Sequence, residues 1–170
     1  RSPKSFNSQI GVPLSIWGIK AHHSLGIFEA GISQMNEMQR LEPIVKPEFG
    51  ILTHMGEAHG KNFESDEEKL REKLQLFRHT KHLIYRASSN TIPIVSEEIK
   101  KINPNCELIS WSTTDPNQSI FIYWKIQGKS SQLKFQKRNQ SEAFLSVQCQ
   151  LHDEASLENL THCLIQAHLL

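Results

Sequence analysis

Residues 25–77 decide how the chain is interpreted. The stretch holds three segments, LGIFEAGIS (25–33), PEFGILTHMGEAHG (47–60) and ESDEEKLREKLQLF (64–77). Short, continuously apolar runs are typical of buried strands, so residues 25–30 and 49–53 are predicted to be strands. Ser65 precedes three acidic residues and predicts the start of a helix, whose dipole favours anions in its first turn.

Outside this stretch, helical and strand patterns alternate and then give way to an antiparallel pattern. The predicted elements are a loop over 1–15 leading into a helix, helices over 35–45 and 97–102, strands at 82–85, 107–111 and 144–151, a hairpin of 120–127 with 132–137, and a final helix capped by Ser156. We therefore expect an α/β fold with a mostly parallel sheet, flanking helices and an antiparallel β edge.

Length and charge narrow the possible partners. The chain has 170 residues, which fits one domain or one domain plus a fragment. Nineteen basic and eighteen acidic residues give a net charge of +1, which argues against nucleic acid or a membrane surface as partner. Cys106, Cys149 and Cys163 are scattered and odd in number, as expected for reduced thiols in a cytoplasmic protein.

Two side chains suggest a metal site. Glu29 ends one predicted strand and His59 follows the next. Ligands of open α/β sheets bind beyond the carboxyl ends of the strands, so both side chains could face one crevice. A carboxylate and an imidazole can both coordinate a divalent cation. The alternative is that Glu29 caps a nearby helix and His59 is an ordinary loop histidine.

Lys73 is a further candidate. It lies four residues after Lys69 on the predicted helix, and could simply be solvated. With a pKa depressed by burial or nearby cations, its neutral amine could take up carbon dioxide and become a metal-binding carbamate. No phosphate-binding loop of the GxxxxGK[ST] or GxGxxG type occurs in the sequence.

Several motifs in one order resemble a known family. NSQIGVP (7–13), IFEAGIS (27–33), PEFGILTHMGEAHGKNF (47–63) and EKLQLF (72–77) look like the central domain of the Mur ligases. Within the family the likeness is strongest to members that join D-Ala-D-Ala to UDP-N-acetylmuramoyl-tripeptide. SPKSFNSQIGVPLSIW (2–17) and DEASLENLTHC (153–163) resemble the form fused to an alanine racemase in the Bacteroidetes group.

The resemblance implies a fold, a reaction and cofactors. The fold is that of P-loop nucleotide hydrolases. The reaction is an ATP-dependent amide ligation of peptidoglycan precursor synthesis in the cytoplasm, through an acyl phosphate. ATP and two Mg²⁺ ions are the implied cofactors, and pyridoxal phosphate would belong only to a fused racemase.

The resemblance also implies roles for single residues. They are Glu29 and His59 as magnesium ligands, Lys73 as the carbamylated lysine that helps to hold a second magnesium, Asn7, Ser8 and Gln9 as contacts of the UDP-linked substrate, and Asn159 as a contact on the adenine side of ATP.

The chain also departs from the family. We expect the phosphate loop before residue 1 and the C-terminal domain after residue 170, so that 1–170 is a partial, inactive ATP-binding domain. The family's Asn-Ala-Asp reads Arg86-Ala87-Ser88, and its Gly-x-His-Asn reads Asp153-Glu154-Ala155-Ser156. These changes leave a second hypothesis open, a degenerate, non-catalytic ligase domain that serves as a binding or assembly module for a fused racemase.

Overall fold

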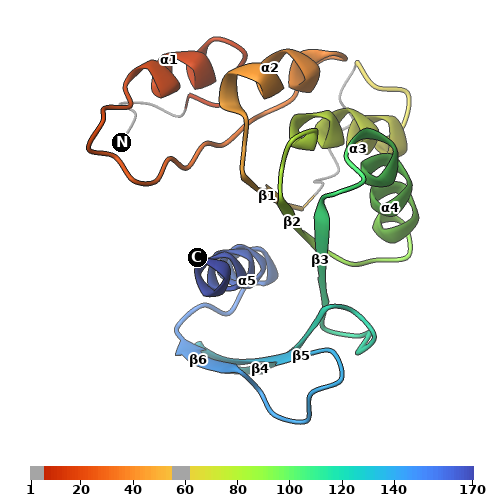
Figure 1. Ribbon diagram of the computed structural model, residues 1–170. Helices are drawn as coiled ribbons and strands as arrows, with labels where there is room; N and C mark the ends of the chain where they lie inside the picture. The colour runs from red at the N-terminus through yellow and green to blue at the C-terminus, as the bar shows by residue number, and fades with distance from the viewer. Residues whose placement is uncertain (1–5, 55–61) are drawn as a thin grey trace. The chain divides into compact units, whose positions relative to one another are not determined.

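The computed structural model describes residues 6–54 and 62–170. The chain divides into two compact units, which we call unit 1 (residues 1–48, 55–80 and 94–106) and unit 2 (residues 49–54, 81–93 and 107–170). Unit 1 contains the N-terminal helices and unit 2 contains the sheet (Figure 1). Helix α4 (Thr91–Ile102) begins in unit 2 and continues into unit 1.

Unit 2 is built on one sheet whose strands follow each other in chain order. They are β1 (Phe49–Leu52), β2 (His82–Arg86), β3 (Glu107–Ser112), β4 (Ile120–Gln127), β5 (Ser130–Lys137) and β6 (Leu145–Cys149). Pairs from β1 to β4 are parallel, and β4–β5 and β5–β6 are antiparallel. This confirms the predicted α/β fold with an antiparallel edge. Gly128, at φ +61°, makes the tight turn of the predicted hairpin.

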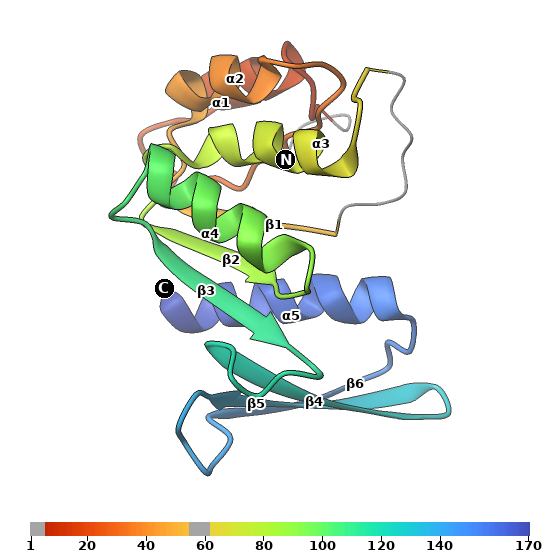
Figure 2. The same cartoon turned by 90° about the vertical axis from the view of Figure 1, so that its right-hand side faces the viewer.

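Helix α5 (Glu154–Leu169) covers one face of this sheet (Figure 2). Leu157 and Ile165 on the helix pack with the inward side chains of the strands, among them Trp111, Leu133 and Phe135. The helix is capped by Asp153 and not by the predicted Ser156, because Asp153 Oδ1 accepts the Ser156 backbone N–H at 2.8 Å. Ser156 lies within the first turn, where its backbone N–H donates the capping hydrogen bond.

Unit 1 packs helices α1 (Gly11–Trp17), α2 (Glu37–Val45) and α3 (Asp66–Leu74), the last followed by the short 3₁₀ helix η1 (Gln75–Phe77). Val12, Met38 and Leu41 form a buried apolar cluster between α1 and α2. The predicted cap of α3 is confirmed, since Ser65 Oγ accepts the Glu68 backbone N–H at 3.1 Å. No helix of the described residues has the length and apolar character needed to cross a bilayer.

Three further predictions of local structure are wrong. Residues 25–30 form no strand, and Ile27 is 87% exposed. An apolar run becomes a strand only where a neighbour pairs with its backbone, and these residues have none within the described chain. Helices α1 and α4 begin earlier than predicted, because Pro13 and Pro93 each stand in a first helical turn, which needs no proline N–H.

Candidate functional site

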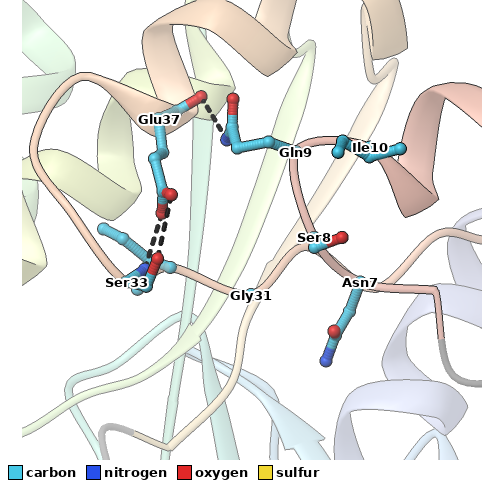
Figure 3. A pocket seen from close by; sticks show the side chains of 8 residues that line it. Asn7, Ser8, Gln9, Ile10, Gly31, Ser33 and Glu37 are labelled. Atoms are coloured by element: carbon cyan, nitrogen blue, oxygen red, sulfur yellow. Dashed lines mark hydrogen bonds between the residues drawn. The ribbon is translucent and has the colours of Figure 1, made fainter.

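A cleft of about 380 Å³ lies in unit 1, where the start of α1 meets the start of α2. Its lining residues are Asn7, Ser8, Gln9, Ile10, Gly31, Ile32, Ser33 and Glu37 (Figure 3). The three residues predicted to contact the UDP-linked substrate therefore lie together on one side of it.

The Asn7–Gln9 wall is held by local contacts. Ser8 Oγ accepts the Gly11 N–H at 3.1 Å and so stabilises the start of α1. Gln9 Nε2 donates to the Glu37 carbonyl oxygen at 2.9 Å, which ties this segment to α2. A Cβ at Gly11 would stand 2.8 Å from Phe6 Cα, so the close approach of the Phe6 backbone to the start of α1 requires glycine there.

Glu37 forms the opposite wall. Its carboxylate accepts the Ser33 N–H at 2.6 Å, the Ser33 hydroxyl at 2.9 Å and the Gln34 N–H at 3.1 Å. Partial burial opposes its ionisation, but the hydrogen bonds from Ser33 and Gln34 and the charge of Arg40 together outweigh that effect and lower the pKa of Glu37. Sequence reasoning missed this residue. The capping-box pattern does not mark it, because that pattern places the glutamate three positions after the serine, whereas Glu37 follows Ser33 by four.

Glu29 lies beside the Asn7 wall. The Asn7 amide donates to Glu29 Oε1 at 3.0 Å, and the Gly31 N–H donates to the Asn7 carbonyl at 2.7 Å. Glu29 ends no strand, but its carboxylate is both exposed and oriented. The structure thus brings together Glu29 and Asn7, which are 22 positions apart in the sequence.

Lys73 lies half-buried on α3 in the same unit and is therefore not a solvated side chain. Burial, and after it the positive charge of Lys69, lower the pKa of Lys73. Both effects favour the neutral amine, the form that can take up carbon dioxide.

Glu29 and Lys73, two of the three predicted magnesium ligands, lie among the described residues, and the chemistry of their side chains suits that ion. An exposed carboxylate and a lysine that could carry a carbamate are oxygen donors of the kind that Mg²⁺ prefers. His59 lies outside the described residues. In residues 6–54 and 62–170, no group of three or more His, Cys, Asp or Glu side chains gathers as a metal site. Asn159 is exposed on α5 in unit 2.

The two stretches that differ from the family motifs, 86–88 and 153–156, contact each other through Arg86 and Glu154. The Arg86 guanidinium donates to Glu158 at 2.7 Å and forms an ion pair with Glu154 at 2.8 Å. It also lies 5.6 Å and 5.5 Å from the ring centroids of Trp111 and Trp124. Burial opposes the Arg86 charge, but the hydrogen bonds to the two carboxylates outweigh it and raise the pKa of Arg86.

Comparison with known proteins identifies the family. The profile described as the Mur ligase middle domain matches residues 1–167. A UDP-N-acetylmuramoyl-tripeptide--D-alanyl-D-alanine ligase of Treponema pallidum is 33% identical over 100 residues, which are 54% of this chain and 22% of that protein. The enzyme of the same name from Borreliella burgdorferi is 30% identical over 128 residues, 75% of this chain and 27% of the relative. The chain thus spans about a quarter of these curated relatives.

A solved structure supports the fold. The crystal structure of MurF from Acinetobacter baumannii superposes with a TM-score of 0.75 at 17% identity, over 96% of this chain and 34% of that one. At this identity the likeness concerns the fold alone. The family match covers nearly the whole chain, and we conclude that this chain belongs to the Mur ligases and corresponds to their middle domain.

Proposed function

We propose that the polypeptide carrying this chain is an ATP-dependent ligase that adds D-Ala-D-Ala to UDP-N-acetylmuramoyl-tripeptide. Both curated relatives described above are named for that activity. The observation that carries the proposal is the cleft that unites Asn7, Ser8 and Gln9, together with the hydrogen bond from Asn7 to Glu29. We further propose that a phosphate loop precedes residue 1, that a C-terminal domain follows residue 170, and that the isolated chain is inactive.

The residues of this chain supply binding and orientation. Glu29, Lys73 as a carbamate and His59 would hold magnesium, which when bound neutralises charge on the phosphoryl group that moves from ATP to the substrate carboxylate. Asn7 orients the Glu29 carboxylate. Ser8 and Gln9, fixed to α1 and α2, present polar atoms to the UDP-linked substrate along one side of the cleft.

The test is ADP release and product formation by the complete polypeptide with Mg²⁺, ATP and both substrates. Glu29→Ala should lower turnover by about 100-fold or more, the scale on which loss of one electrostatic stabiliser slows a reaction. Glu142→Ala is the matched control, because Glu142 is an exposed carboxylate in unit 2. Unchanged turnover of Glu29→Ala would reject the metal role.

A second candidate function rests on the Arg86 network. Arg86 and Glu154 stand within the two stretches that depart from the family pattern, and they pair with each other. A domain whose adenine-side residues have become an internal ion pair could serve as a non-catalytic module, for example for a fused alanine racemase. Calorimetry of the complete polypeptide with Mg²⁺ and ATP separates the two functions, because absence of nucleotide binding would favour the module.

A further inference from the structure

Glu72 is a buried carboxylate whose described contact lies on another helix. Its side chain belongs to α3, and the residue is 4% exposed. Its Oε1 accepts the backbone N–H of Met38, the second residue of α2, at 3.0 Å. A buried carboxylate needs such a partner, because desolvation of an unpaired charge is very unfavourable.

The start of α2 lacks a cap of its own. Asn36 occupies the N-cap position with φ at 65°, in the left-handed region, and its side chain makes no capping hydrogen bond. The first amides of a helix need acceptors, and the dipole favours a negative charge beside them. Glu72 supplies both the acceptor and the negative charge from the neighbouring helix, so the stability of the first turn of α2 depends on α3.

This contact links the two halves of the candidate site. Glu72 is the neighbour of Lys73 in the sequence, and Met38 is the neighbour of Glu37, which forms a wall of the cleft. Glu37 in turn holds Ser33 and accepts from Gln9 through its carbonyl. A continuous set of short contacts therefore runs from α3 to the cleft.

We propose that Glu72 is a positioning residue, which holds the first turn of α2 against α3 and thereby fixes Lys73 relative to the cleft that contains Asn7 and Glu37. The inference rests on the proposed function for its catalytic consequence, but the contact itself does not. No part of the reaction takes place at Glu72.

A second buried carboxylate also holds α2, and its removal shows what a purely structural loss would do. Near the other end of α2, the buried carboxylate of Glu42 meets His79 Nδ1 at 2.7 Å. Glu42 is 4% exposed, as is Glu72. Both carboxylates fasten α2 to the segment formed by α3, η1 and the residues after them, but only Glu72 does so beside the cleft and Lys73.

The experiment compares Glu72→Ala, Glu72→Gln and Glu42→Ala in the complete polypeptide. For Glu72→Ala we expect about a tenfold lower kcat and a several-fold higher Mg²⁺ concentration for half-maximal activity, on the scale known for residues that orient metal ligands. The KM for D-Ala-D-Ala should change less than twofold. Glu72→Gln keeps an acceptor for the Met38 N–H and should recover most of the kcat.

Hydrogen exchange gives a readout that needs no activity. The Met38 amide should exchange at least tenfold faster in Glu72→Ala than in Glu42→Ala. The inference is overturned if Glu72→Ala and Glu42→Ala show the same kcat, Mg²⁺ requirement and Met38 exchange. It is also overturned if Glu72→Gln fails to rescue a protein that is folded by circular dichroism. If the unsubstituted polypeptide neither binds ATP nor releases ADP, the proposed function fails instead, and the exchange result still decides whether Glu72 holds α2.

Discussion

Each unit holds a partly buried cation, and the surroundings of the two cations shift their pKa values in opposite directions. In unit 2, two carboxylates and two indole rings surround the Arg86 guanidinium, and the pKa of Arg86 is raised. In unit 1, burial and the positive charge of Lys69 act against the Lys73 ammonium, and the pKa of Lys73 is lowered. One arrangement stabilises the charge, and the other favours its loss.

The difference indicates which of the two cations is the better candidate for chemistry. A residue whose charge is fully compensated contributes by fixing its neighbours, here the end of β2 against α5. A residue whose surroundings disfavour its charge is a better candidate for chemistry, because enzymes shift pKa values toward the form that reacts. This contrast supports a chemical role for Lys73 and a structural role for Arg86.

The largest expected effect is on stability and follows from Arg86→Leu. This change removes the closest cation of Glu158, whose side chain is 4% exposed. We expect a loss of about 3 kcal/mol in the free energy of unfolding, the low end for a broken buried pair, because the Arg86 side chain keeps 30% exposure. Urea denaturation measures it.

The double variant Arg86→Leu with Glu158→Leu tests whether the lost stability comes from charge pairing or from packing. Replacing both charges by apolar groups should restore most of the lost stability, since no unpaired buried charge remains. Equal destabilisation in the single and double variants would show that packing on Trp111 and Trp124, rather than charge pairing, is what Arg86 provides.

Lys73→Met should lower activity but raise stability, whereas Arg86→Leu lowers stability. Turnover of the complete polypeptide should fall by about 100-fold or more, because the proposed carbamate ligand of magnesium is lost. At neutral pH, stability should rise, because methionine fills a similar volume without a disfavoured charge. Thermal unfolding and ADP release on the same preparation measure both.

The stability gain of Lys73→Met should also depend on pH. The folded-state pKa of Lys73 lies below its unfolded value, so between the two values the unfolded state binds more protons. The stability of the unsubstituted protein therefore rises across that window, and the advantage of Lys73→Met shrinks as the pH approaches about 10.4. An advantage that grows with pH would contradict the lowered pKa.

The sequence predicted most of unit 2 because its signals are local. The alternating pattern of Ile120–Gln127 and the Gly128 turn specify a hairpin with no reference to the rest of the chain. The strand predicted at 25–30 failed because pairing is not local. An apolar run shows that a segment can be a strand, but not that a partner is present.

The candidate site was predictable only in part. Asn7 and Glu29 were both named from the sequence, but their contact across 22 positions follows from how the chain folds. Glu37 and Glu72 were missed because acidic residues are common in helices, and only the folded structure shows which backbone N–H groups their carboxylates accept. The Asp153 cap was missed because Ser156, three residues later, is an equally good capping residue by type.

A smaller effect is expected from the cap of α3, the helix that carries Lys73. Ser65→Ala removes the acceptor for the Glu68 N–H and should lower the free energy of unfolding by about 1 kcal/mol. Ser65→Asp should recover it, because aspartate caps as well as serine. Urea denaturation of both variants tests the prediction, and equal stability of Ser65→Ala and the unsubstituted protein would show that α3 is held by tertiary contacts alone.

The smallest effect concerns the cap of α5 and depends on pH. The Ser156 backbone N–H, followed by its side chain, lowers the pKa of Asp153. For a carboxylate with a depressed folded-state pKa, the stabilisation is present above the unfolded value of about 3.9 and is lost as the pH falls through the lower folded value. Asp153→Asn keeps a capping side chain but loses the charge that favours a helix N-terminus. The urea midpoint of this variant should therefore lie slightly below that of the unsubstituted protein at pH 5.5, and the gap should close by pH 2.5. A gap that stays constant over this range would mean that the carboxylate acts only through the shape of its hydrogen bond.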